Sequence, residues 1–98
     1  MVIMETKKIF CVIAYDVSDD KRRAKVVKIL ERYGARVNFS VFECMLTPIQ
    51  LQTVKSSILS LLDVRSDSVV YYTICLNCYT KIDYQPPKKT KSNVIMVK

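Results

Sequence analysis

The 98-residue chain contains no histidine, a single glycine and no apolar run near the roughly 20 residues that a membrane span needs. Without histidine the usual general base is missing, so hydrolysis would have to rely on a metal held by carboxylates. The chain also lacks a glycine-rich loop for phosphate binding. Its first eight residues hold no apolar segment long enough for a secretory signal, and we therefore expect a cytoplasmic protein.

Charge is the strongest signal in the composition. The chain has 16 Lys and Arg against 9 Asp and Glu, a net charge of +7. A surplus of this size indicates a polyanionic partner, most simply DNA or RNA. A membrane surface fits less well, because no basic helical segment carries exposed bulky aromatic residues.

The four cysteines are expected to stay reduced and to serve structure. Cys11 and Cys44 lie in apolar strand patterns, where Cys behaves as a small hydrophobe. Cys75 and Cys78 form a CxxC pair, but zinc needs four ligands, so two copies of the chain would have to supply them. A redox CxxC opens a helix after a strand, whereas β-prone residues follow this pair.

The stretch from residue 9 to residue 34 predicts the unit around which the fold is organised. Residues 9–17 form an apolar, β-prone run whose end carries one acid, Asp16. Ligands bind at such strand ends in open α/β sheets, although Asp also starts turns for purely local reasons. A helix follows, with Ser18 as its expected N-cap and Gly34 as its expected left-handed C-terminal cap.

This helix carries a basic stripe opposite its apolar face. Its apolar residues have the spacing of one buried face: Val26, Val27, Leu30 and Tyr33. Five of the eight residues from Lys21 to Lys28 are basic, with no Glu among them to form i, i+4 pairs. Phosphate contacts would relieve the resulting repulsion; the alternative is a solvated face. The candidate nucleic-acid ligands on this helix are Lys21, Arg22, Arg23, Lys25, Lys28 and Arg32.

The middle of the chain predicts two short strands and a second helix. Residues 36–46 are rich in β-formers but change parity midway, which indicates a bulge or a sharp bend. Thr47 and Gln50 form a capping box, and Pro48 takes the first helical position. An apolar stripe follows on that helix.

The remaining residues predict strands over 68–76 and 79–84. The resulting order is that of an α+β, ferredoxin-like βαββαβ sandwich, in which two helices cover one sheet. We expect residues 1–84 to form this domain. Residues 85–98 are expected to be a basic linker and an additional C-terminal edge strand, 94–97, packing on a sheet edge of a dimer partner.

The chain resembles a family of small CRISPR-associated proteins, the dimeric partners of the spacer-acquisition integrase, also described as metal-dependent endoribonucleases or DNases. Three motifs carry the resemblance: YDVSDDKRR at 15–23, GARV at 34–37 and SVFEC at 40–44. The similarity runs from about Ile9 to Leu76 and weakens through the tail.

The resemblance implies a homodimer in which Asp16 faces its two-fold copy and binds Mg²⁺ or Mn²⁺ between the two carboxylates. Tyr15, Arg23, Arg36 and Phe42 match other positions implicated in cleavage. With Asp16 they are the candidate catalytic residues, and Arg36 joins the candidate nucleic-acid ligands. The implied partners are the CRISPR integrase and DNA or RNA, and the implied activity is phosphodiester cleavage.

Two other functions remain open. One carboxylate per protomer gives Mg²⁺ few protein ligands. This favours a non-catalytic scaffold that binds duplex DNA while the integrase does the chemistry. An mRNA-cleaving toxin of the virulence-associated type shares the fold. The chain also departs from some family members at Lys25, where they carry Arg; Lys keeps the charge but lacks the bidentate fork.

Overall fold

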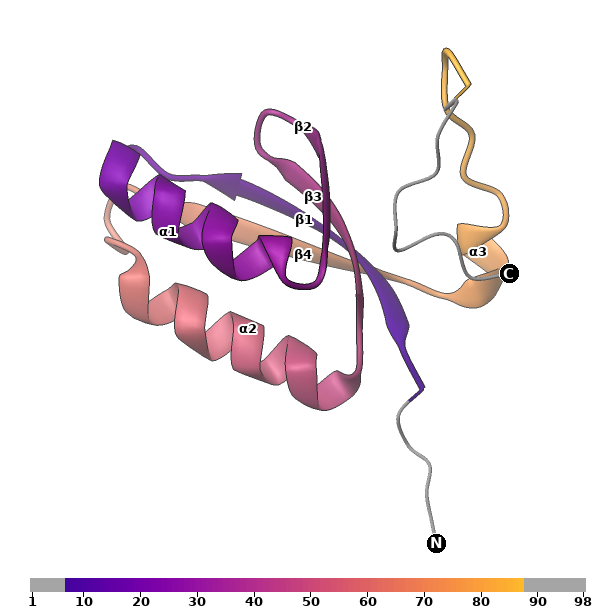
Figure 1. The fold of residues 1–98 in the computed structure, drawn as a ribbon, viewed down its shortest axis with the longest axis horizontal. Coiled ribbons are helices and arrows are strands. Elements are labelled where there is room, and N and C mark those ends of the chain that lie inside the picture. The colour runs from indigo at the N-terminus through magenta and orange to yellow at the C-terminus, as the bar shows by residue number, and fades with distance from the viewer. Residues whose placement is uncertain (1–6, 88–98) are drawn as a thin grey trace, which may run out of the picture.

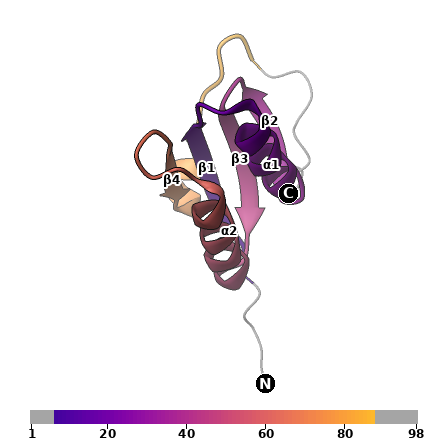
Figure 2. The same cartoon turned by 90° about the vertical axis from the view of Figure 1, so that its left-hand side faces the viewer.

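The structure, a computed structural model, describes residues 7–87. Its elements follow the order β1 (Ile9–Asp16), α1 (Asp20–Glu31), β2 (Gly34–Asn38), β3 (Val41–Leu46), α2 (Pro48–Leu61), β4 (Ser68–Ile74) and α3 (Leu76–Tyr79). The strands form an antiparallel sheet of order β2-β3-β1-β4, and α1 and α2 cover the same face of it (Figures 1 and 2). This is the ferredoxin-like α+β sandwich that the sequence predicts.

The hydrophobic core lies between the sheet and the two long helices. Because side chains alternate along a strand, Cys11, Ile13 and Tyr15 of β1 all point to the helical side and are buried there. The same core receives Val26 and Leu30 from α1, Phe42, Cys44 and Leu46 from β3, and Leu51, Val54 and Ile58 from α2. The apolar faces predicted for both helices are therefore confirmed.

The ends of α1 differ from the prediction. Asp19, and not Ser18, is the N-cap, because its carboxylate accepts a hydrogen bond from the backbone N–H of Arg22 at 2.9 Å. The Ser18 hydroxyl instead donates to Asp67 at 3.2 Å. The predicted left-handed cap is also wrong: α1 ends at Glu31, and its C-cap is Arg32, in the right-handed region, two residues before the glycine.

Gly34 is needed for close approach and not for its backbone angles. It is the first residue of β2, opposite Cys44 of β3, and its φ is not positive. A Cβ placed on it would lie 2.0 Å from the carbonyl oxygen of Glu43. Any side chain here would have to push β3 aside.

β2 and β3 form a hairpin whose tip is Phe39 and Ser40. At the tip, the Asn38 carboxamide oxygen accepts the N–H of Phe39 at 2.8 Å, which is the local turn chemistry expected of Asn. The pairing register shifts between Arg36 and Asn38. The parity change therefore reflects both two short strands and an irregularity within the first of them.

The capping box at the start of α2 is confirmed. The Thr47 hydroxyl accepts the N–H of Gln50 at 3.1 Å, and the Gln50 side chain accepts the N–H of Thr47 at 2.9 Å. Two backbone N–H groups that the helix leaves without internal partners are thereby satisfied.

The segment after β4 is helical where a strand was predicted. The residues that follow Cys75 form the single turn of α3, and the chain then turns instead of forming a strand over 79–84. The prediction that β-prone structure follows the CxxC pair is therefore wrong. Cys11 and Cys44 are buried as expected, but Cys75 and Cys78 are exposed, and all four are free thiols. The strand expected at 94–97 lies outside the described residues.

Candidate nucleic-acid interface

Asp16 is the last residue of the central strand β1 and is exposed. Its neighbours Tyr15 and Val17 point into the core, so alternation turns Asp16 to the face of the sheet away from the helices. Across the sheet it pairs with Ser68, the first residue of β4. The predicted metal ligand is thus a solvent-facing carboxylate at the rim of an open sheet face.

This open sheet face is only partly covered. At one end, the Tyr79 ring packs on Phe10 with centroids 4.7 Å apart, and the Tyr84 hydroxyl donates to the Glu43 carboxylate at 2.7 Å. Burial, reinforced by that hydrogen bond, raises the pKa of Tyr84. Toward the Asp16 end, β4 leaves apolar surface bare: Val70 is 43% exposed and Tyr72 is 53% exposed.

Tyr15 and Phe42, two of the candidate catalytic residues, lie inside the core. Their ring centroids are 6.1 Å apart. The Tyr15 hydroxyl donates to the backbone carbonyl of Phe39 at 3.0 Å, so it holds the hairpin tip. In this structure both rings are covered by the core, and the Tyr15 hydroxyl is engaged by the hairpin backbone.

Arg23 is placed next to the end of β1. Its Nη1 donates to the carbonyl oxygen of Val17 at 2.7 Å, and its Nη2 pairs with Asp20 on the same helix. The carbonyl that it binds belongs to the residue after Asp16. The guanidinium therefore lies at the C-terminal end of β1, with 40% of the Arg23 side chain exposed.

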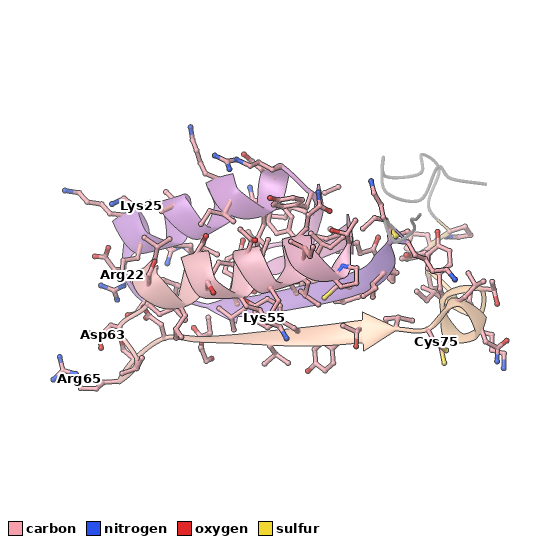
Figure 3. All side chains as sticks on the ribbon, turned by 90° about the horizontal axis from the view of Figure 1, so that it is seen from below. Arg22, Lys25, Lys55, Asp63, Arg65 and Cys75 are labelled. Atoms are coloured by element: carbon pink, nitrogen blue, oxygen red, sulfur yellow. The ribbon has the colours of Figure 1, made fainter. Side chains whose placement is uncertain are left out.

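Arg22 faces a different partner. Its Nε donates to Oδ2 of Asp67 at 2.8 Å and its Nη2 to Oδ1 at 3.3 Å. The Asp67 side chain is fully buried and also accepts the backbone N–H groups of Ser18 and Asp63. The Arg22 guanidinium, followed by the Asp63 N–H, holds the pKa of Asp67 well below its ordinary value of 3.8. In Figure 3, Arg22 and Asp63 lie at the same end of the sandwich.

The Arg22–Asp67 pair changes the interpretation of the basic stripe. The planar guanidinium of Arg22 makes a two-point contact with the Asp67 carboxylate, so in this conformation it cannot make the same contact with a phosphate. Asp67 itself was not singled out from the sequence. The Asp-rich connection between α2 and β4 was visible, but nothing in it marks which acid is buried.

The remaining cations of the stripe are exposed along α1 as predicted: Lys21, Lys25, Lys28 and Arg32. Figure 3 shows Lys25 on α1. Arg36 is exposed on β2, the edge strand beside α1. A groove of about 540 Å³ between α1 and the hairpin is lined by Arg23, Lys28, Arg36 and Phe39, among others. The fold thus brings Arg23 and Arg36 to one surface, as phosphate recognition requires.

A metal site is not complete within one protomer. Over residues 7–87, no group of three or more His, Cys, Asp or Glu side chains is arranged to hold a metal ion. Asp16 supplies the oxygen donor that Mg²⁺ and Mn²⁺ prefer, but only one such side chain. Within the same part of the chain, no helix is long and apolar enough to cross a bilayer.

The fold and the site define a class: a small ferredoxin-like protein with a basic helical face beside an exposed acid at the end of its central strand. Residues 9–82 match the family of the CRISPR associated protein Cas2. The "CRISPR-associated endoribonuclease Cas2 3" of Synechocystis sp. is 37% identical over 78 residues, covering 78% of this chain and 85% of that protein. The chain therefore belongs to the CRISPR-associated Cas2 family.

Solved structures agree with this assignment. Streptococcus pyogenes Cas2, crystallised at pH 6.5, superposes with a TM-score of 0.69 at 30% identity, covering 76% of this chain and 96% of that one. A chain of a partial Cas6-RT-Cas1–Cas2 complex also gives a TM-score of 0.69, at 26% identity, covering 82% of this chain and 88% of that one.

Proposed function

We propose that this protein is a nucleic-acid-binding component of CRISPR spacer acquisition, working as a homodimer with the CRISPR integrase, and that it cleaves phosphodiester bonds at Asp16. The observation that carries the proposal is the position of Asp16, exposed at the end of β1, the same end of the strand at which Arg23 binds the Val17 carbonyl. The names of its relatives, "CRISPR-associated endoribonuclease" and "CRISPR-associated endonuclease", support the reaction class. The solved Cas1–Cas2 assembly supports the partner.

The homodimer would form through the open sheet face. Val70 and Tyr72 expose apolar surface there, and Asp16 stands at the rim of the same face. A two-fold axis near that rim would bring each Asp16 to its copy and so double the carboxylates available to one ion. Mutual repulsion of the two carboxylates would oppose this approach until a cation binds.

Asp16 of each protomer would hold Mg²⁺ or Mn²⁺, and the bound cation would supply Lewis-acid activation of water and phosphate. Arg23 would keep its guanidinium beside the strand end, because the Val17 carbonyl fixes its direction. Arg36, exposed on β2, would bind a second phosphate oxygen. Tyr15 and Phe42 would position the hairpin instead of touching substrate.

The second candidate function is the non-catalytic scaffold, in which the dimer binds duplex DNA for the integrase. It is supported by the exposed cations of α1, Lys21, Lys25 and Lys28. It needs only the dimer and the basic surface. The family assignment makes either of these functions better supported than the toxin alternative.

The deciding experiment is cleavage of labelled RNA and duplex DNA with Mg²⁺, with Mn²⁺ and with chelator. Wild type is compared with Asp16→Asn, and Asp83→Asn makes the same chemical change at another exposed acid. We expect metal-dependent cleavage that Asp16→Asn abolishes and Asp83→Asn keeps, with binding intact in both. Cleavage that survives in Asp16→Asn would indicate a contaminant. Binding without cleavage in the wild type would leave the scaffold.

A further inference from the structure

Phe39 is the most exposed large apolar residue in the described part of the chain, at 90%. It occupies the tip of the β2–β3 hairpin and lines the groove next to α1. Exposing a phenyl ring costs favourable burial, and in folded proteins solvent-facing aromatic rings recur where a partner covers them. The Phe39 ring is therefore a candidate contact surface for a ligand.

The hairpin tip is held firmly in place. The Tyr15 hydroxyl donates to the Phe39 carbonyl at 3.0 Å, and the Tyr15 N–H donates to the Ser40 carbonyl at 3.0 Å. The Asn38 side chain accepts the Phe39 N–H at 2.8 Å. Because the backbone on both sides of the ring is fixed to β1, Phe39 is presented to solvent in a defined position.

That position is at the Asp16 end of the sheet. β3 pairs with β1 so that Val41 lies opposite Ala14 and Leu46 lies opposite Ile9. The hairpin tip before Val41 therefore lies at the C-terminal end of β1, where Asp16 is. The start of α2, which follows β3, lies at the opposite end.

The groove beside Phe39 combines this ring with positive charge. Arg23, Lys28 and Arg36 line it, together with two acids, Asp20 and Glu31. Asp20 and Arg23 form an ion pair with each other, so the positive charge that can face a phosphate comes from Lys28 and Arg36. Cations next to a flat apolar surface match the two halves of a nucleotide, a phosphate and a base.

We infer that Phe39 is a stacking platform for an unpaired base, so that the groove at the Asp16 end of the sheet holds one unpaired nucleotide of an RNA or DNA strand. The inference rests on the proposed nucleic-acid-binding function and adds the residue that would contact a base. In a duplex both faces of each base are already stacked, and inserting a ring costs a few kcal/mol per step. An unpaired base has a free face and needs no such distortion.

The chain contains no tryptophan, so Phe39→Trp places a unique fluorophore at the proposed platform. Oligothymidine should quench this tryptophan, whereas an oligomer of the same length with abasic sites should bind more weakly and quench little. Ile49→Trp is the matched control, since Ile49 is 78% exposed at the opposite end of the sheet. It should show no base-dependent quenching.

Affinity provides the second readout. Phe39→Ala should weaken binding of single strands roughly tenfold, because one base–aromatic stack is worth about 1–3 kcal/mol. Phe39→Tyr should restore it, and Ile49→Ala should have no effect. Binding of blunt duplex should change less than about twofold in all three variants.

Three outcomes would overturn the inference. Equal weakening of single strands and duplex by Phe39→Ala would make the ring a duplex contact. Unchanged affinity for both, with wild-type binding intact, would leave the proposed function standing and remove the platform. Absence of nucleic-acid binding by the wild type would remove both.

Discussion

Arg22 and Asp67 form a two-point ion pair, with Nε–Oδ2 at 2.8 Å and Nη2–Oδ1 at 3.3 Å, across 45 residues of sequence. The pair joins the first turn of α1 to the residue before β4. The Ser18 and Asp63 N–H groups bind the same carboxylate, so three separate loops or helix ends meet on Asp67. A residue expected to bind nucleic acid is thus part of the framework that orients α1.

Asp67→Asn should destabilise the protein most at neutral pH. The folded-state pKa of Asp67 lies below its unfolded value, so its contribution is complete above about pH 4 and declines as pH falls further. The difference in Tm between wild type and Asp67→Asn should therefore shrink on acidification below about pH 4. Thermal unfolding followed by circular dichroism measures it, with exposed Asp83→Asn as control. A Tm difference that does not change with pH would contradict the assignment.

Charge reversal of Lys21, Lys25 and Lys28 to Glu should weaken binding of all nucleic-acid sequences. Loss of two to three phosphate contacts should flatten the plot of log affinity against log salt by about 2–3 units. Reversal of Lys7, Lys8 and Lys81, which are exposed outside α1, gives the same net charge as a control. If both triple variants behave alike, the stripe on α1 is a solvated face and only total charge matters.

Tyr72→Lys should disrupt the proposed homodimer. A lysine in the middle of the open face would be desolvated without a partner in each protomer. We expect at least about tenfold weaker self-association in sedimentation velocity. Leu59→Lys is the matched variant, because Leu59 is a similarly exposed apolar residue, at 61%, on α2. Dimerisation that resists Tyr72→Lys but not Leu59→Lys would place the interface on the helical side.

Cys75 should be the most reactive thiol of the four. The Cys78 N–H, followed by the Cys78 thiol, lowers the pKa of Cys75, and the same contact raises the pKa of Cys78. Burial raises the pKa of Cys44 to about 12 and also raises that of Cys11. Since the thiolate is the nucleophile, iodoacetamide should label Cys75 first, with a midpoint below the ordinary pKa of 9.0. Peptide mapping over a pH series checks this, and faster labelling of Cys44 would contradict it.

The parts of the fold that were predicted from sequence are those encoded by local chemistry. The capping box of Thr47 and Gln50 and the apolar stripes of α1 and α2 depend on residues within a few positions of each other. Asp16 could be found because a lone acid ends an apolar run. The motif resemblance then supplied the family, which the comparisons confirm.

The predictions that proved wrong concern residues whose interaction partners are distant in sequence. Ser18 has the chemistry of an N-cap, but its hydroxyl binds Asp67, and Asp19 takes the cap. Gly34 has the usual position of a helix C-cap, yet its constraint comes from β3. The β-prone residues near Tyr79 become helical and turn structure as that ring packs on Phe10.

The candidate site residues also divide into those placed by local sequence and those placed by distant parts of the fold. The exposed cations of α1 follow from helical periodicity, whereas the burial of Tyr15 and Phe42 depends on which strand face meets the helices. The sequence indicated a parity change midway through residues 36–46 but did not single out Phe39, and only the hydrogen bonds from Tyr15 show that the backbone on both sides of this ring is fixed. Whether each candidate takes part in cleavage stays a prediction.

The bond from the Tyr15 hydroxyl to the Phe39 carbonyl ties the hairpin tip to a ring that is itself 3% exposed. The groove wall and the core then belong to one cooperative unit, because the tip cannot open while Tyr15 stays packed. Amides near residue 40 should accordingly exchange hydrogen with the protection of the central strand and not with that of an ordinary surface loop. Loss of activity in a variant at Tyr15 would therefore not by itself identify Tyr15 as a reacting group, because the same change would release the hairpin tip.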